Sequence, residues 1–191
     1  MLTSFYDNAD LREMGFSSIG KNVRLSRKAS FYNPGGISIG DCSRIDDFCV
    51  LSAGIGGLEI GRNVHIAVYV SMFGQAKIQI GNFAGLSSHV AVYSSNDDYS
   101  GEYMTGPTVD SFYTRVHSAP VTIGEHVIIG SGSIILPGVT LGEGVSIGAL
   151  SLVNKDCEAF KVYAGTPVRY LKDRSRNLLK LAEKLFQEEE S

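Results

Sequence analysis

The chain of 191 residues has no tryptophan, only five prolines and only three cysteines. Cys42, Cys49 and Cys157 are odd in number and lack the paired spacing of a zinc site, so neither a disulfide framework nor a cysteine-based metal centre is indicated. No apolar run reaches the roughly 18 residues that a membrane-spanning helix needs. The first residues carry acids where a signal peptide would be basic and then apolar. We therefore expect a cytoplasmic protein with reduced thiols and no membrane span.

The chain also lacks a large excess of charge of either sign. Seventeen basic and 20 acidic residues give a net charge of −3, which argues weakly against nucleic acid as a partner. The length fits one domain with appendages and is enough to bury a core.

What the chain has in abundance is an apolar period of six residues. The interval between successive apolar anchors is six, except after every third anchor in the first four groups, where it is 8, 9, 8 and 31. Insertions confined to every third step predict a coil with three short strands and one corner that tolerates extra residues. The anchors are Ile19, Leu25, Phe31, Ile39, Ile45, Leu51, Ile60, Ile66, Met72, Ile80, Leu86, Val92, Ile123, Ile129, Ile135, Leu141, Ile147 and Val153.

A second set of positions completes the predicted interior. The residue four places after each anchor is mostly small or β-branched, such as Val23, Cys49, Ile55 and Val127, and is expected to point inward. The residue directly after an anchor is often glycine, as in Ile60-Gly61, which suits a tight corner. The pattern predicts an all-β solenoid of about six triangular coils.

The remaining segments lack this period. Residues 1–18 are expected to form an extension with a short helix from Asp7 to Met14, and residues 19–170 the solenoid, interrupted by a loop at 97–119. Apolar residues at helical spacing predict an amphipathic C-terminal helix over residues 171–191.

The hexads, together with HVIIGSGSIILPGVTLGEGVSIGALSLVNKD at 126–156 and YAGTPVRYLKDR at 163–174, resemble the hexapeptide-repeat acyltransferases. The nearest pattern is that of the galactoside, maltose and nucleotide-sugar acetyltransferases. The stretch SSNDDYSGEYMTGPT at 94–108 resembles a loop of members linked to surface-polysaccharide synthesis. The resemblance implies a left-handed parallel β-helix, a homotrimer with active sites between subunits, and acetyl-CoA lying along the coils.

The same resemblance implies the residues that bind acetyl-CoA. Ser131 and Ala149 would meet the pantetheine arm through backbone groups, while the nucleotide end would be surrounded by Asn154, Lys155, Arg169 and Lys172. Fixed cations suit this end because coenzyme A carries a pyrophosphate and a 3′-phosphate.

The base is the point at which the chain departs from the family pattern. In the galactoside and maltose enzymes the long loop begins with histidine and proline, whereas this chain has Asn96-Asp97-Asp98. His89, expected to face outward, is the first candidate because imidazole titrates near working pH; an ordinary surface histidine is the alternative. His65, expected one coil below His89, and His117, at the far end of the loop, are candidate acceptor contacts.

Asp97 and Asp98 suggest a different role for this loop. A carboxylate is a poor base for a sugar hydroxyl, but it can hold a hydroxyl or an ammonium group by charge-assisted hydrogen bonds. We take Asp97 as a catalytic candidate and Asp98, with Tyr93, as acceptor contacts; a turn-forming role for the two acids is the alternative. An amine needs little help from a base, so the pattern slightly favours N-transfer.

The sequence therefore predicts an acetyl-CoA-dependent acetyltransferase that acts on a sugar or a nucleotide-linked amino sugar, in surface-polysaccharide synthesis and without a metal. Two alternatives remain open. One is a non-catalytic trimeric scaffold that kept only the solenoid. The other is an enzyme like the trimeric carbonic anhydrases, in which three histidines hold zinc between subunits.

Overall fold

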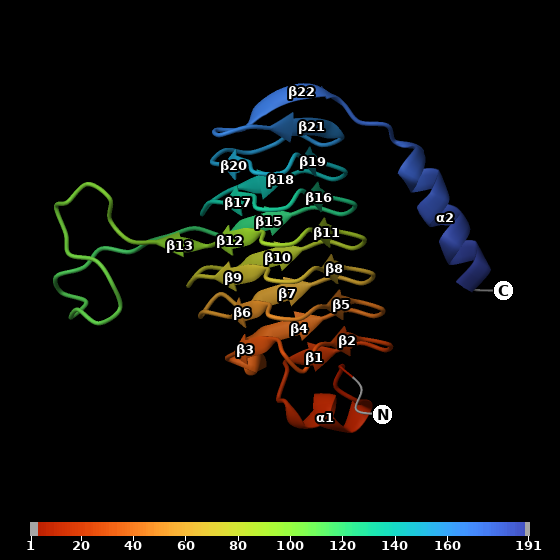
Figure 1. Ribbon diagram of the computed structural model, residues 1–191, viewed down its shortest axis with the longest axis horizontal. Helices are drawn as coiled ribbons and strands as arrows, with labels where there is room; N and C mark the ends of the chain where they lie inside the picture. The colour runs from red at the N-terminus through yellow and green to blue at the C-terminus, as the bar shows by residue number, and fades with distance from the viewer. Residues whose placement is uncertain (1–3, 190–191) are drawn as a thin grey trace.

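The computed structural model describes residues 4–189, and their main feature is a solenoid with three parallel sheets (Figure 1). Sheet 1 consists of β1 (Ser18–Ile19), β4 (Ile37–Ile39), β7 (Leu58–Ile60), β10 (Ile78–Ile80), β15 (Val121–Ile123) and β18 (Thr140–Leu141). Sheet 2 consists of β2 (Arg24–Leu25), β5 (Arg44–Ile45), β8 (His65–Ile66), β11 (Gly85–Leu86), β16 (Ile128–Ile129), β19 (Ser146–Ile147), β21 (Lys161–Ala164) and β22 (Arg169–Asp173). Sheet 3 consists of β3 (Ser30–Tyr32), β6 (Val50–Ser52), β9 (Ser71–Phe73), β12 (Ala91–Tyr93), β17 (Ile134–Ile135) and β20 (Leu152–Val153).

The period of six produces this stack because it returns each anchor to the same place after one coil. Ile60 pairs with Ile80 and Ile80 with Ile123, and all three are buried. Sheet 2 adds one more parallel strand, β21, so the solenoid has about seven turns where the sequence predicts about six. The interior is a continuous apolar core along the stack.

The inward positions differ from the prediction at the corner between sheets 3 and 1. Ile55, expected to point inward, is fully exposed, whereas Ala53 and Leu58 are buried in its place. The reason is the interval of nine residues after Leu51. The extra residues extend the corner into solvent, so the chain returns to the core at Leu58 instead of at Ile55. The prediction for Ile55 is therefore wrong.

The glycines after the anchors serve close approach rather than unusual backbone angles. A Cβ placed on Gly40 would lie 2.6 Å from the carbonyl carbon of Gly61, and one on Gly61 would lie 2.6 Å from Oδ1 of Asn82. Positive φ occurs two residues later, at Asn63 (55°) and at Phe83 (59°). Successive corners are therefore too close for a side chain at the glycine position.

The inserted loop leaves the stack at one coil and returns to the next. β13 (Ser95–Asn96) pairs in antiparallel fashion with β14 (His117–Ser118), and an isolated bridge joins Met104 and Thr114 further out. Figure 1 shows the inserted loop projecting away from the three sheets.

Both ends of sheet 2 are covered by antiparallel chain. At the start, Phe5 forms an antiparallel bridge with Ser26, and α1 (Asn8–Glu13) follows, capped by the side chain of Asp7. At the other end, β22 pairs in antiparallel fashion with β21. A short η1 (Pro34–Gly36) lies at one corner of the stack.

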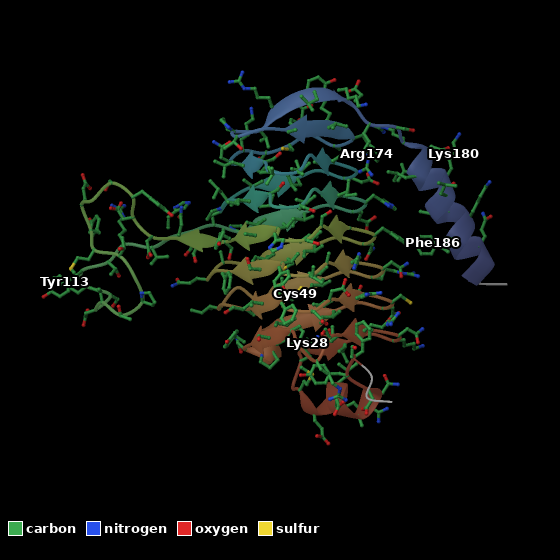
Figure 2. The ribbon with its side chains drawn as sticks, viewed as in Figure 1. Lys28, Cys49, Tyr113, Arg174, Lys180 and Phe186 are labelled. Carbon is green, nitrogen blue, oxygen red and sulfur yellow. The ribbon has the colours of Figure 1, made fainter. Side chains whose placement is uncertain are left out.

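The C-terminal helix begins later than the sequence predicts. α2 spans Asn177–Glu189, whereas residues 169–173 form β22, so the predicted start at residue 171 is wrong. Pairing with β21 supplies β22 with backbone hydrogen bonds that sequence periodicity does not report. A guanidinium nitrogen of Arg174 donates to the carbonyls of His126 and Gly144 at 2.9 and 3.0 Å, and Phe186 meets Phe83 with ring centroids 5.6 Å apart (Figure 2). Within residues 4–189, neither helix is long and apolar enough to cross a membrane.

Candidate active site

A groove of about 380 Å³ on the outer face of sheet 2 joins two predicted site residues. Its walls come from β8, β11 and β16 and from the corner that follows them. The lining residues are His65, Ala67, Gly85, Leu86, Ser87, Ser88, Ile128 and Ser131. His65, a predicted acceptor contact, therefore shares a groove with Ser131, a predicted pantetheine contact.

His65 is held in place from the coil below. Its Nε2 lies 2.8 Å from Oδ2 of Asp46, and the other oxygen of Asp46 accepts a hydrogen bond from Nε of Arg44 at 2.6 Å. Burial alone would raise the pKa of Asp46, but the hydrogen bonds from His65 and Arg44 outweigh it, so the pKa is lowered. Asp46 is therefore an anionic support for the imidazole ring.

A line of exposed residues leads from the groove toward the last coils, along the corner between sheets 2 and 3. The N–H of Leu150 donates to the carbonyl of Ser131 at 2.9 Å, and the Thr166 hydroxyl donates to the carbonyl of Leu150 at 3.2 Å. Ser131 and Ala149 are exposed on this line, one coil apart. An extended ligand that starts in the groove would reach the β21–β22 hairpin after three coil steps, about 14 Å at the usual strand spacing.

The four residues predicted at the nucleotide end are all exposed near the last coils. Asn154 and Lys155 directly follow β20, while Arg169 and Lys172 lie on β22. Both strand residues are thus fixed on a hairpin; for Lys172 this replaces the predicted position in the C-terminal helix. Arg174, two residues further along, is half-buried against backbone carbonyls, and burial lowers its pKa.

A second hollow, of about 610 Å³, lies at the base of the inserted loop, and we call it the loop-base hollow. Asp97, Asp98 and His117 line it together with Asn96, Tyr99, Arg115, Val116 and Ser118. The antiparallel pair β13–β14 brings them together by placing His117 opposite Asn96. Oδ1 of Asn96 is buried and has no hydrogen-bond partner within residues 4–189.

The two carboxylates of this hollow have different surroundings. Asp98 accepts hydrogen bonds from the hydroxyl of Ser100 and the N–H of Gly101, both at 2.9 Å, and these bonds, the one from Ser100 first, lower its pKa. Asp98 therefore stabilises a local turn. Asp97 also lines an adjoining hollow of about 620 Å³ together with Tyr93, so it contributes to both hollows.

His89 is outside both the groove and the loop-base hollow. It lies at a corner with φ of 62°, and its ring stacks on Tyr69 with centroids 4.8 Å apart. Tyr69, not His65, is the residue one coil below His89, because His65 pairs with Gly85 in sheet 2. The expectation that His65 lies below His89 is wrong. His65 lies on a strand of sheet 2 and His89 at a corner, and these two positions are apart in every coil.

Sequence reasoning missed Asp46, Gly85 and Ser87. Asp46 and Ser87 each directly follow the second anchor of a coil, and Gly85 precedes such an anchor. These positions flank an inward anchor and so face outward on sheet 2. Listing the outward neighbours of His65 on each coil would have found all three.

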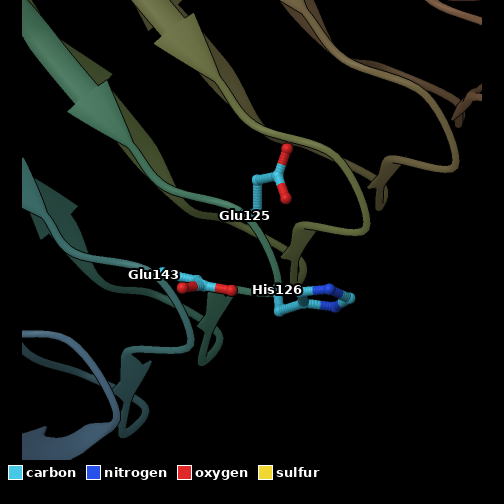
Figure 3. A group of neighbouring side chains, drawn as sticks. All are labelled: Glu125, His126 and Glu143. Carbon is cyan, nitrogen blue, oxygen red and sulfur yellow. The ribbon is translucent and has the colours of Figure 1, made fainter. Parts of the chain in front are cut away.

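One further cluster lies on the corner beside α2. Ligand atoms of Glu125, His126 and Glu143 lie within 4.8 Å of one another (Figure 3). One oxygen of Glu125 accepts a hydrogen bond from Asn82 at 2.8 Å, and His126 stacks on Phe83 at 4.9 Å. One imidazole and two exposed carboxylates differ from the three-histidine set of the carbonic anhydrase alternative.

Comparison with known proteins identifies the family. Residues 120–155 match a family model described as bacterial transferase hexapeptide (six repeats). A dTDP-4-amino-4,6-dideoxy-D-glucose acyltransferase of Escherichia coli is 55% identical over 178 residues, which is 93% of either chain. The chain belongs to the hexapeptide-repeat acyltransferases. It is therefore an acyltransferase, as the sequence predicts.

Other hexapeptide-repeat acyltransferases show how far the likeness extends. AntD, an N-acyltransferase from Bacillus cereus solved in complex with dTDP and 3-hydroxybutyryl-CoA, is 44% identical with a TM-score of 0.95 over the whole of both chains. Galactoside O-acetyltransferase of Escherichia coli is 31% identical over 116 residues, 61% of this chain and 54% of its own. Further AntD structures carry replacements of one serine or one aspartate, and some contain dTDP-4-amino-4,6-dideoxyglucose with coenzyme A.

Proposed function

We propose that the protein transfers an acyl group from acyl-CoA to the amino group of dTDP-4-amino-4,6-dideoxyglucose. The observation that carries this proposal is the 55% identity, over 93% of the chain, to an acyltransferase of that nucleotide sugar. AntD, which is also similar over the full length, supports an amide rather than an ester as the product because it is an N-acyltransferase.

The residues of the loop suit an amine acceptor. The neutral amine nitrogen attacks the thioester carbonyl, a C–N bond forms and the C–S bond breaks. One proton of the attacking nitrogen ends on the departing sulfur, so coenzyme A is released as a thiol. Because an uncharged amine is already a nucleophile, a carboxylate that orients it is sufficient where a hydroxyl would need a base. Asp97 takes this orienting role, which accounts for the absence of a histidine at the start of the loop.

Ser87 is the partner that we assign to Asp97. A serine hydroxyl in the groove can donate to the carbonyl oxygen as negative charge develops on it. Ser87 and Asp97 are ten positions apart, as are the serine and the aspartate replaced in the AntD variants. Ser88 and Asp98 have the same spacing, but Asp98 is engaged by Ser100 and Gly101.

The two halves of this site are separate within one chain. The groove and the loop-base hollow have no lining residue in common. We propose that a homotrimer brings the loop of one subunit to the groove of its neighbour, so that Asp97, His117 and Tyr93 face Ser87 and His65 across the interface. Acyl-CoA would then run from the groove past Ser131 and Ala149 toward Arg169 and Lys172.

An acyl-transfer assay with three acceptors tests the function. We expect dTDP-4-amino-4,6-dideoxyglucose to release free coenzyme A thiol and to gain one acyl group by mass spectrometry. The matched 4-hydroxy nucleotide sugar tests O-transfer, and the same amino sugar without its nucleotide tests the need for dTDP. Turnover of the hydroxyl compound at an equal or higher rate would contradict N-transfer. If dTDP-4-amino-4,6-dideoxyglucose is not acylated at all, the proposed acceptor is wrong.

A further inference from the structure

We propose that Gly85 forms a notch in the groove that receives the acyl group of the donor and sets how long that group can be. The inference rests on the proposed function for the identity of the donor as an acyl-CoA. It goes beyond it by assigning the acyl group a place on sheet 2 and by naming the residue that limits its size.

The notch is a gap in an otherwise continuous column of side chains. Strand pairing aligns one outward position from each parallel strand of sheet 2, and in this column Gly85 alone lacks a side chain. The column consists of Arg24, Arg44, His65, Gly85, Ile128, Ser146 and Val162. A Cβ placed on Gly85 would meet nothing within 4 Å, in contrast to the glycines at the corners. His65 and Ile128 are therefore two coil steps apart, about 9.6 Å between backbones, with open space between them.

The walls of this space suit a short acyl chain. Ile128 forms one wall and is 45% exposed, an uncovered aliphatic side chain that can contact methylene groups. His65 forms the opposite wall, and its hydrogen bond to Asp46 keeps that wall in a fixed position. Ala67, two residues after His65 on the same coil, adds a small apolar surface to the groove.

The polar groups lie where the thioester would enter. Ser88 and Ser131 both line the groove beside the notch. Their coils are joined there, since the N–H of Gly132, next to Ser131, donates to the carbonyl of Ser88 at 3.0 Å. A pantetheine arm that descends past Ala149 and Ser131 reaches the groove with its acyl group leading. The chain beyond the carbonyl then has the notch at Gly85 as its nearest open space, with His65 able to bond a hydroxyl on that chain.

The sharpest test narrows the notch without disturbing the fold. Gly85 lies in a strand, has no positive φ and has room for a side chain, so Gly85→Ala and Gly85→Val are expected to fold as the parent does. We would measure kcat/KM with acetyl-CoA, butyryl-CoA and 3-hydroxybutyryl-CoA. The parent is expected to use the four-carbon donors, and Gly85→Val to lower their kcat/KM relative to acetyl-CoA by about 10- to 200-fold, the usual discrimination by pocket size. Gly85→Ala should have a smaller effect in the same direction.

Gly35→Ala is the matched control. Gly35 also lacks a positive φ, and its Cβ would meet only a carbonyl oxygen at 3.8 Å, far from the groove in the sequence of coils. It should leave the donor ratio unchanged. A parent enzyme that rejects every four-carbon donor would overturn the proposal. So would a Gly85→Val enzyme with an unchanged donor ratio and a raised KM for the sugar, because the notch would then belong to the acceptor.

Binding without an acceptor separates this proposal from the proposed function. By calorimetry, butyryl-CoA should bind the parent more tightly than coenzyme A, and Gly85→Val should abolish that difference. If this holds while no amino sugar is acylated, the proposed acceptor is wrong and the notch stands. If the amino sugar is acylated but the acyl chain adds no affinity that Gly85→Val removes, the notch is wrong and the proposed function stands.

Discussion

Oδ2 of Asp46 lies 2.8 Å from Nε2 of His65, so two side chains from neighbouring coils form one hydrogen-bonded unit beside the groove. The lowered pKa of Asp46 means that its carboxylate stabilises the fold above its unfolded pKa of about 3.9 and that this contribution is lost as the pH falls through the lower, folded value. We expect Asp46→Asn to reduce the free energy of unfolding by about 1 kcal/mol near pH 6, since His65 and Arg44 are about half exposed.

Urea denaturation at several pH values checks this expectation. The difference between the parent and Asp46→Asn should shrink below about pH 4 and vanish once the pH lies below the lowered pKa of Asp46 in the folded protein, where both side chains are neutral. Glu59→Gln is a suitable control, because Glu59 and its partner Lys77 are both exposed and should contribute little at any pH. A difference that grows toward acid would contradict the assignment.

Asp97→Asn should act on the acceptor. Loss of a charged hydrogen bond to the amine is expected to raise the KM for the nucleotide amino sugar by about 10-fold or more, with the KM for acyl-CoA unchanged. Asp98→Asn, which removes a turn contact instead, should have the smaller kinetic effect. Steady-state kinetics with each substrate varied in turn decides the matter, and a change confined to acyl-CoA would remove Asp97 from the acceptor site.

The double change Arg169→Ala and Lys172→Ala should weaken acyl-CoA binding. Lost pairing with phosphate groups is expected to raise the KM for acyl-CoA by about 10-fold. Comparison with the dephospho-CoA thioester, which lacks the 3′-phosphate, sharpens the test: the parent should prefer the phosphorylated donor and the variant should not. Lys180→Ala, a change on exposed α2, is the control (Figure 2). Unchanged kinetics in the double variant would place the nucleotide end elsewhere.

His89 can be tested as a base by a substitution that keeps its stack on Tyr69. If the acceptor is an amine, we expect His89→Phe to keep kcat within about 3-fold of the parent, because the aromatic contact persists and no strong base is required. A loss of about 100-fold, together with loss of the acidic limb in the pH–rate profile, would restore His89 as the general base predicted from the sequence.

The three thiols should differ in reactivity. Burial raises the pKa values of Cys49 and Cys157 to about 11, whereas Cys42 is exposed. Because the thiolate is the reactive form, a disulfide reagent at about pH 8 should modify one thiol per native chain rapidly and all three after denaturation. Cys42→Ser should abolish the rapid phase. A rapid phase of two or three thiols would mean that the solenoid opens in solution.

Much of the fold could be predicted because the solenoid is a local pattern repeated. Ile60, Ile80 and Ile123 lie on one wall because each coil returns the chain to the same place. The positions of the insertions in the sequence indicate which corner tolerates extra residues. The predictions are wrong where the structure of a segment depends on contacts or corner lengths that the six-residue period does not contain. Residues 169–173 are a strand because β21 lies beside them, and Ile55 faces solvent because the longer corner before it changes which residue re-enters the core.

The candidate site was predicted less completely for a related reason. The residue types were informative, and the structure does bring His65 to Ser131 and His117 to Asp97. The neighbours of each side chain depend, however, on whether it lies on a strand or at a corner, which separates His65 from His89. The notch at Gly85 appears only when His65 and Ile128 are seen on either side of it.

The antiparallel chain at both ends of sheet 2 has a consequence for assembly. A stack of identical rungs offers the same unpaired strand edge at its top as at its bottom, so nothing in the repeat itself limits its length. Phe5 opposite Ser26, and β22 against β21, reverse the chain direction at these two edges, so a further parallel rung finds no template there. The reversals thus terminate the stack and keep copies of the chain from joining end to end along sheet 2 into a fibre.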